Sequence, residues 1–214
     1  MSVAEGTRGE GVRRLEAGVA FFFIGVLYLL LPQRLRLGPR WPVPVIVGAL
    51  LLLIFLAHAR GYHQLSHWLG RAATCLATLA VASIAAFMVF RLPAGKVSGR
   101  QLLAEAGATW AANVLVFALW YWEIDGGGPA QRQPGRYHSR DFVFPQIQQD
   151  PIESPRPWMP ELIDYVFLAF NTSTAFSPTD TLVLSRRAKL LLMAQSLISL
   201  LVIALLAARA INTL

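Results

Sequence analysis

The chain has 214 residues, of which 55% are hydrophobic and only 14% are charged, with one cysteine and a formal net charge of +7. This composition excludes an ordinary soluble core and an intramolecular disulfide, and it indicates a membrane protein with several spans. The basic residues lie in short loops between apolar runs, so membrane orientation explains the positive charge better than a nucleic-acid partner does.

Four apolar runs occupy the first part of the chain. Arginines precede the first run, as in a signal peptide, but Pro32 and further arginines follow it where a small-residue cleavage site would stand. We therefore expect a retained span. Residues 1–123 are predicted to form a four-helix transmembrane region. Its spans are expected at residues 17–31, 41–59, 72–90 and 106–122.

The fourth run combines small and polar side chains. Ala104, Ala108 and Ala112 recur every four residues, which predicts close packing against another helix. Asn113 lies in the middle of the run. A polar group inside a membrane is costly and faces a partner or a cavity. A hydrogen bond to a neighbouring helix is the commoner arrangement, and a contact with a transported species is the alternative.

Residues 124–159 form a long polar stretch rich in proline and glycine. Such a sequence predicts an extramembrane loop without a core of its own. Its one apolar piece, residues 142–144, is expected to pack onto the bundle or a partner. His138, Ser139 and Asp141 are neighbours in sequence, but no nucleophile motif surrounds them. We predict no enzymatic activity, no cofactor and no metal site.

The basic residues of the short loops predict an orientation. The loops at 34–40 and 91–100 carry three basic residues each and lie on one side of the membrane. The opposite side holds the N-terminal segment, with three, and the loop at 60–71, with two. The excess of six against five favours a cytoplasmic position for the first pair of loops, with the long polar loop outside.

Residues 160–184 admit two topologies. Pro160 and Glu161 favour a helix start, and the helix is expected to end near Thr174. In one interpretation it is a re-entrant half-helix whose carbonyl end faces a polar constriction. In the other, residues 162–184 span the membrane. The predicted pore-lining residues are Asn171, Thr172, Ser173, Thr174, Ser177, Thr179 and Asp180.

A final apolar helix is expected over residues 190–208. Gln195 and Ser199 lie four residues apart and therefore share one face of it. Together with Asn113 they are the predicted supporting polar residues, and we expect Gln195 or Ser199 to contact the polar row at 171–174.

Residues 164–208 resemble the pore helix, filter and inner helix of two-transmembrane potassium channels. The resemblance rests on the aromatic-rich run at 165–170, on Thr172 and Thr174, on Asp180, and on the basic start of the last helix. It implies a pore built from several copies around an axis. Ala-Phe-Ser-Pro-Thr at 175–179 replaces the glycine-containing filter, so potassium selectivity is not implied.

A broader resemblance covers the four spans, the glycine-rich loop, the run at 164–170 and the Thr-Asp-Thr turn at 179–181. In these features the chain resembles a bacterial family of inner-membrane proteins of unknown function. The resemblance implies a multi-pass protein of the bacterial inner (plasma) membrane and no particular chemistry.

The sequence thus predicts an all-α polytopic transmembrane helix bundle with five full spans plus a re-entrant half-helix, or with six spans. Residues 160–214 supply the half-helix or span, the polar turn and the last helix. We expect an ion-channel-like pore or transport protein in the lipid bilayer, homo-oligomeric if it is a pore and open to inorganic cations. The alternative is a non-conducting structural or assembly protein.

Overall fold

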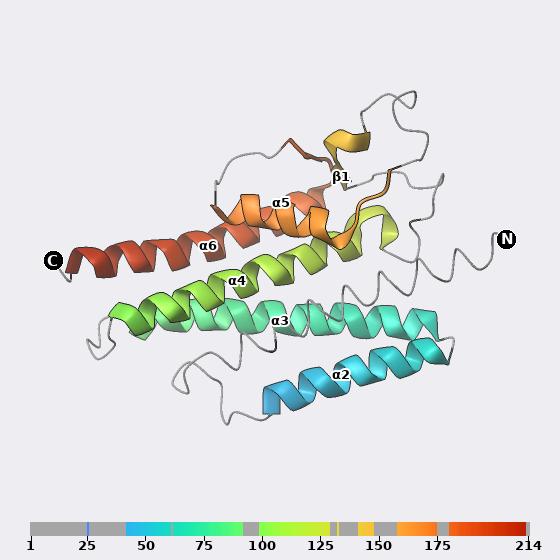
Figure 1. The fold of residues 1–214 in the computed structure, drawn as a ribbon, viewed down its shortest axis with the longest axis horizontal. Coiled ribbons are helices and arrows are strands. Elements are labelled where there is room, and N and C mark those ends of the chain that lie inside the picture. The colour runs from blue at the N-terminus through green and yellow to red at the C-terminus, as the bar shows by residue number, and fades with distance from the viewer. Residues whose placement is uncertain are drawn as a thin grey trace. The chain divides into compact units, whose positions relative to one another are not determined.

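The computed structural model describes residues 42–60, 62–91, 99–128, 132, 141–147, 158–174 and 180–212, together with residue 25. Its α-helices are α2 (Pro42–Ala59), α3 (His63–Arg91), α4 (Gly99–Ile124), α5 (Leu162–Thr174) and α6 (Arg186–Asn212) (Figure 1). Strands β1 (Phe142–Val143) and β2 (Leu182–Val183) pair antiparallel, with Phe142 opposite Val183. Short 3-10 turns, η3 (Asp125–Gly127) and η4 (Pro145–Ile147), follow α4 and β1.

The chain divides into two compact units. Within the described residues, unit 1 covers 117–196 and unit 2 covers 42–116 and 197–212. Helices α4 and α6 therefore contribute residues to both units.

Within the described residues, three helical stretches are long and apolar enough to cross a membrane, namely Trp68–Val89, Gly99–Gly127 and Arg186–Ala208. The predicted five spans plus a half-helix exceed this number. Helix α5 has 13 residues, so at about 1.5 Å per residue it is about 20 Å long, shorter than the roughly 30 Å hydrocarbon core of a bilayer. The first predicted span, residues 17–31, lies outside the described residues except for residue 25.

The long helices begin earlier than their apolar runs. Helix α3 starts at His63 and α4 at Gly99, whereas the apolar runs suggested starts near 72 and 106. A helix that has nucleated is extended at little cost by polar residues with reasonable propensity, because each adds one backbone hydrogen bond. Hydropathy therefore locates the membrane part of each helix and not its ends.

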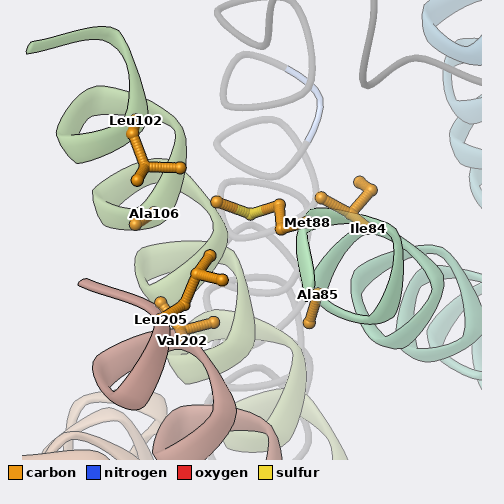
Figure 2. Close-up of a cluster of buried hydrophobic side chains, with 7 residues drawn as sticks. All are labelled: Ile84, Ala85, Met88, Leu102, Ala106, Val202 and Leu205. Carbon is orange, nitrogen blue, oxygen red and sulfur yellow. The ribbon is translucent and has the colours of Figure 1, made fainter. Parts of the chain in front are cut away.

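A buried apolar cluster joins α3, α4 and α6 in unit 2 (Figure 2). Met88 of α3 points toward Leu102 and Ala106 of α4. Ala106 is fully buried, and the small side chain lets the helix backbones approach closely. The cluster consists of Ile84, Ala85, Met88, Leu102, Ala106, Val202 and Leu205.

The inner face of α4 includes only part of the predicted alanine face, since Ala112 is buried and Ala108 is half-buried. Ala104 is exposed, whereas Glu105, Thr109 and Asn113 are buried. Successive residues of a helix differ by about 100° in direction, so turning this polar row inward turns Ala104 outward. Exposing the polar row to lipid would be costly, which explains why it occupies the inner face.

Part of the loop predicted to lack a core is buried in unit 1. Asp125, Arg132 and Asp141 are buried there, and so are the aromatic rings of Phe142 and Phe144. The expected packing of residues 142–144 onto the protein is thus confirmed. Three consecutive glycines after Asp125, with φ of 60°, 87° and 95°, end α4 in left-handed conformations that other residues rarely adopt.

We predict that Asp141→Asn lowers the free energy of unfolding by about 1–3 kcal/mol, because the buried carboxylate holds a two-bond ion pair with Arg187 that an amide cannot reproduce. Denaturant unfolding in detergent micelles measures the change. Asp180→Asn is the matched control, because Asp180 is exposed and should alter stability little. Equal losses in the two variants would contradict the prediction.

Candidate functional site

The predicted polar row forms the last turn of α5, and most of it faces inward. Thr172 and Ser173 are buried, Asn171 is half-buried and Thr174 is exposed. The Thr172 hydroxyl donates to the carbonyl of Leu168 (2.8 Å), and that of Thr174 to the carbonyl of Phe170 (2.9 Å). These hydroxyl protons are thus committed to the helix's own backbone.

Gln195 of α6 is the centre of a hydrogen-bond network in unit 1. Its Nε2 donates to Ser173 Oγ (2.8 Å) and to the carbonyl of Ala169 (2.7 Å), and its Oε1 accepts from the Tyr121 hydroxyl. The side chains of Gln195, Ser173 and Tyr121 are all 0% exposed. The predicted contact between Gln195 and the polar row is therefore confirmed, and it ties α4, α5 and α6 together.

Asn113 and Ser199 form a second polar contact, in unit 2. Asn113 Nδ2 donates to Ser199 Oγ at 2.9 Å, and both residues are fully buried. Asn113 thus bonds a neighbouring helix, the commoner of the two predicted arrangements. Ser199 was expected to be able to reach the polar row, but its described partner is Asn113.

The outward face of α5 is apolar. Ile163, Phe167 and Phe170 are exposed at helical spacing, with 65% of Phe167 accessible. Thr174 continues the same face by one more turn. A lumen built against this face would be walled mainly by isoleucine and phenylalanine. Ser177 and Thr179 lie outside the described residues, and Asp180 is exposed.

A charged and aromatic centre holds the start of α5. The Tyr165 hydroxyl donates to Asp125 Oδ2 (2.7 Å), and Arg132 Nη1 donates to the Tyr165 oxygen (2.6 Å). The Arg132 guanidinium also lies over the rings of Trp122 and Tyr165, 5.6 and 5.2 Å from their centroids. The Tyr165 hydroxyl thus bridges the buried carboxylate of Asp125 and the buried guanidinium of Arg132. This arrangement offsets the free-energy cost of burying each charge without a partner.

Two phenylalanines from the loop fill the space around this centre. The Phe142 ring contacts Tyr121 and Tyr165 edge-on, at centroid distances of 5.2 and 6.3 Å. Phe144 meets Tyr165 at 5.3 Å in the same manner. The Phe142 amide donates to Asp125 Oδ1 at 3.4 Å. The rings of Phe142, in β1, and of Phe144, just after it, are therefore packed in the interior of unit 1.

Asp141 fixes the start of α6. It accepts from Arg187 Nε (2.7 Å) and Nη2 (2.6 Å) and from the Ser185 hydroxyl. Ser185 Oγ in turn accepts from the backbone N–H of Ala188 (3.2 Å), as an N-cap. Arg187 Nη2 also donates to the carbonyl of Ile124 (3.0 Å), which otherwise lies among the unfilled acceptors at the end of α4.

These contacts fix the course of α5. Tyr165 in its first turn meets Asp125, and Arg187 in the first turn of α6 meets Ile124, so both helices start at the carboxyl end of α4 (Figure 1). At its other end α5 meets Gln195, about two and a half turns into α6. Strand β2 returns the chain to β1, beside Asp125. Both ends of residues 160–185 thus lie at one end of unit 1.

The start of α5 carries its own cap. The backbone N–H of Glu161 donates to Asp164 Oδ2 at 2.8 Å, half of a capping box. Burial raises the pKa of Asp164, and the bond from Glu161 acts in the opposite direction. Asp164, the one acidic residue in the apolar run, thus caps the amino end of α5.

Sequence reasoning missed Asp125, Arg132, Asp141 and Tyr165 as site residues. Charges within a proline-rich loop are usually solvated, so their burial was not foreseen. The useful signal was the aromatic run at residues 142–144, because an apolar segment that packs inward draws the neighbouring carboxylates with it. Within the described part of the chain, no group of three or more His, Cys, Asp and Glu side chains is arranged to hold a metal.

No family model, no curated protein and no solved structure matches this chain. Function is therefore argued from the site itself.

We predict that Gln195→Leu lowers the free energy of unfolding by about 1–3 kcal/mol, because it removes one acceptor and two donors from a buried network. Met193→Leu, at an exposed position of the same helix, is the control. In a Cys75→Ser background, Thr174→Cys should react faster with a thiol reagent once Gln195 is replaced, since the end of α5 loosens. Unchanged stability and unchanged labelling would show that the network does not hold α5.

Proposed function

We propose that this chain is a non-conducting structural or assembly protein of a membrane, in which residues 160–185 form a re-entrant hairpin locked onto α4 and α6. The observation that carries the proposal is the contact between Ser173 and Gln195, two fully buried side chains. Residues that line a pore face water, whereas the centre of this polar row faces a neighbouring helix. The apolar outward face of α5 suits lipid or another protein chain.

The proposed topology has five full spans and one half-helix. Its spans are helices α2, α3, α4 and α6 together with the predicted span at 17–31, which lies outside the described residues except for residue 25. The shortness of α5 and the meeting of both ends of its hairpin near Asp125 support a re-entrant course. Irregular backbone at membrane depth is tolerated where protein covers it, and residues 142–144 with their two phenylalanines supply such a cover. The resemblance stated above favours the bacterial inner membrane.

Cysteine labelling tests this topology. In a Cys75→Ser background, Glu161→Cys and Asp180→Cys should both react with a membrane-impermeant reagent from the same side of the membrane, because both positions are exposed at the two ends of the hairpin. Arg100→Cys, at the other end of α4, should react from the opposite side. Labelling of positions 161 and 180 from opposite sides would show a full span and would exclude the re-entrant hairpin.

A pore is the second candidate function, and one observation favours it. Thr174 and Asp180 are both exposed, and they flank residues 175–179, which follow the carbonyl end of α5 in the sequence. The carbonyl end of a half-helix carries partial negative charge and attracts cations. Several copies around an axis would be needed to enclose such a path, so this candidate requires a homo-oligomer.

Ion flux separates the two functions. We predict that liposomes containing the purified protein lose K⁺ and Na⁺ no faster than protein-free liposomes, because the polar row is closed by Gln195. Addition of a pore-forming ionophore verifies that the vesicles report a leak. Flux above the protein-free rate that falls in Asp180→Asn would overturn the non-conducting proposal in favour of the pore.

A further inference from the structure

The first turn of α6 has an unusual charge arrangement. Arg186, Arg187 and Lys189 place three cations where the helix dipole is already positive. Positive side chains are unfavourable at this end of a helix, and acidic ones are preferred. No acidic residue occupies this first turn. An anionic partner is therefore expected for each of these cations.

Only one of the three has an ion-pair partner in the described part of the chain. Arg187 is paired with Asp141 through two hydrogen bonds. Arg186 and Lys189 are exposed, and neither makes a salt bridge to any residue that the structure describes. Asp180, the exposed carboxylate nearest in sequence, forms no ion pair with them.

The side chains that follow Arg186 and Lys189 on the same face of α6 are apolar and exposed. Leu190 and Met193 are 65% and 62% accessible, and they follow Arg186 at four and seven residues. The residues at 186, 189, 190 and 193 therefore share one face of α6. The stretch of α6 that can cross a membrane begins at Arg186. The boundary between headgroups and acyl chains thus falls at this turn.

We propose that this face of α6 binds an anionic phospholipid, with the phosphate held by Arg186 and Lys189 and one acyl chain lying along Leu190 and Met193. Charge complementarity selects the headgroup, because a zwitterionic lipid would bring its own cation to the same place. Leu182 and Leu184, which precede α6 in the sequence, are also exposed. The site requires only that α6 crosses a bilayer, and it does not depend on whether the chain conducts.

Lipid titration of the full-length protein in neutral detergent tests the proposal. We expect dioleoylphosphatidylglycerol to bind and to raise the unfolding temperature, and dioleoylphosphatidylcholine to do so much less. The double variant Arg186→Gln/Lys189→Gln should bind the anionic lipid roughly 30-fold more weakly, from about fivefold per cation. Equal binding of the two lipids, or unchanged binding by the double variant, would overturn the site.

Matched variants separate this site from general charge attraction. Arg100→Gln removes an exposed cation from the first turn of α4 and should leave the affinity within about twofold. Arg186→Lys/Lys189→Arg keeps both charges and should retain binding, which guards against a folding defect in the neutral variant. Equal weakening by Arg100→Gln, or loss of binding in the charge-keeping variant, would refute the proposal.

Inorganic phosphate distinguishes the lipid from a free anion. We expect millimolar phosphate without lipid to leave the unfolding temperature unchanged, because the acyl contacts with Leu190 and Met193 are missing. If phosphate alone raises the unfolding temperature and this effect disappears in the neutral double variant, the site binds a free anion. That result would overturn the proposal that its ligand is a lipid.

Discussion

Two carboxylates buried beside a membrane helix set the constraint on which unit 1 depends. Asp125 and Asp141 are fully buried, and a buried charge is tolerated only when donors or cations surround it. Asp125 receives the Tyr165 hydroxyl, which Arg132 supports, and Asp141 receives Arg187 and Ser185. Because these partners come from α5, α6 and the loop, satisfying two charges also fixes three segments to the end of α4.

The same requirement explains the direction of the polar row. Serine and threonine hydroxyls at membrane depth need partners, and in this chain α5 supplies them from its own backbone and from Gln195. Ile163, Phe167 and Phe170 are then exposed on the outer face of α5, whereas Tyr165 stays buried. Polarity and direction are thus linked, since a short helix that buries most of its hydroxyls must present its apolar side outward.

The sequence was sufficient to predict the elements with strong local signals. The extent of α5 matches one of the two interpretations of residues 160–184, the helix that begins after Pro160 and ends near Thr174. The contact of Gln195 with the polar row was also expected from residue spacing. The network around Asp125 could not be predicted in this way. The sequence gives no signal that Asp125, Arg132 and Tyr165 interact. Their interaction depends on which loop residues pack inward, and local sequence does not determine this.

The comparison with a potassium-channel pore turns on where the backbone and hydroxyl groups find partners. A selectivity filter leaves its carbonyls free to replace the hydration shell of an ion, and it therefore needs glycines and several copies of the chain around an axis. In this protein Ser173 and the carbonyl of Ala169 are both bonded to Gln195 of the same chain. Because these polar groups already have hydrogen-bond partners within the chain, they are not free to coordinate an ion. The contacts that hold α5 within a single chain are thus the contacts that argue against conduction.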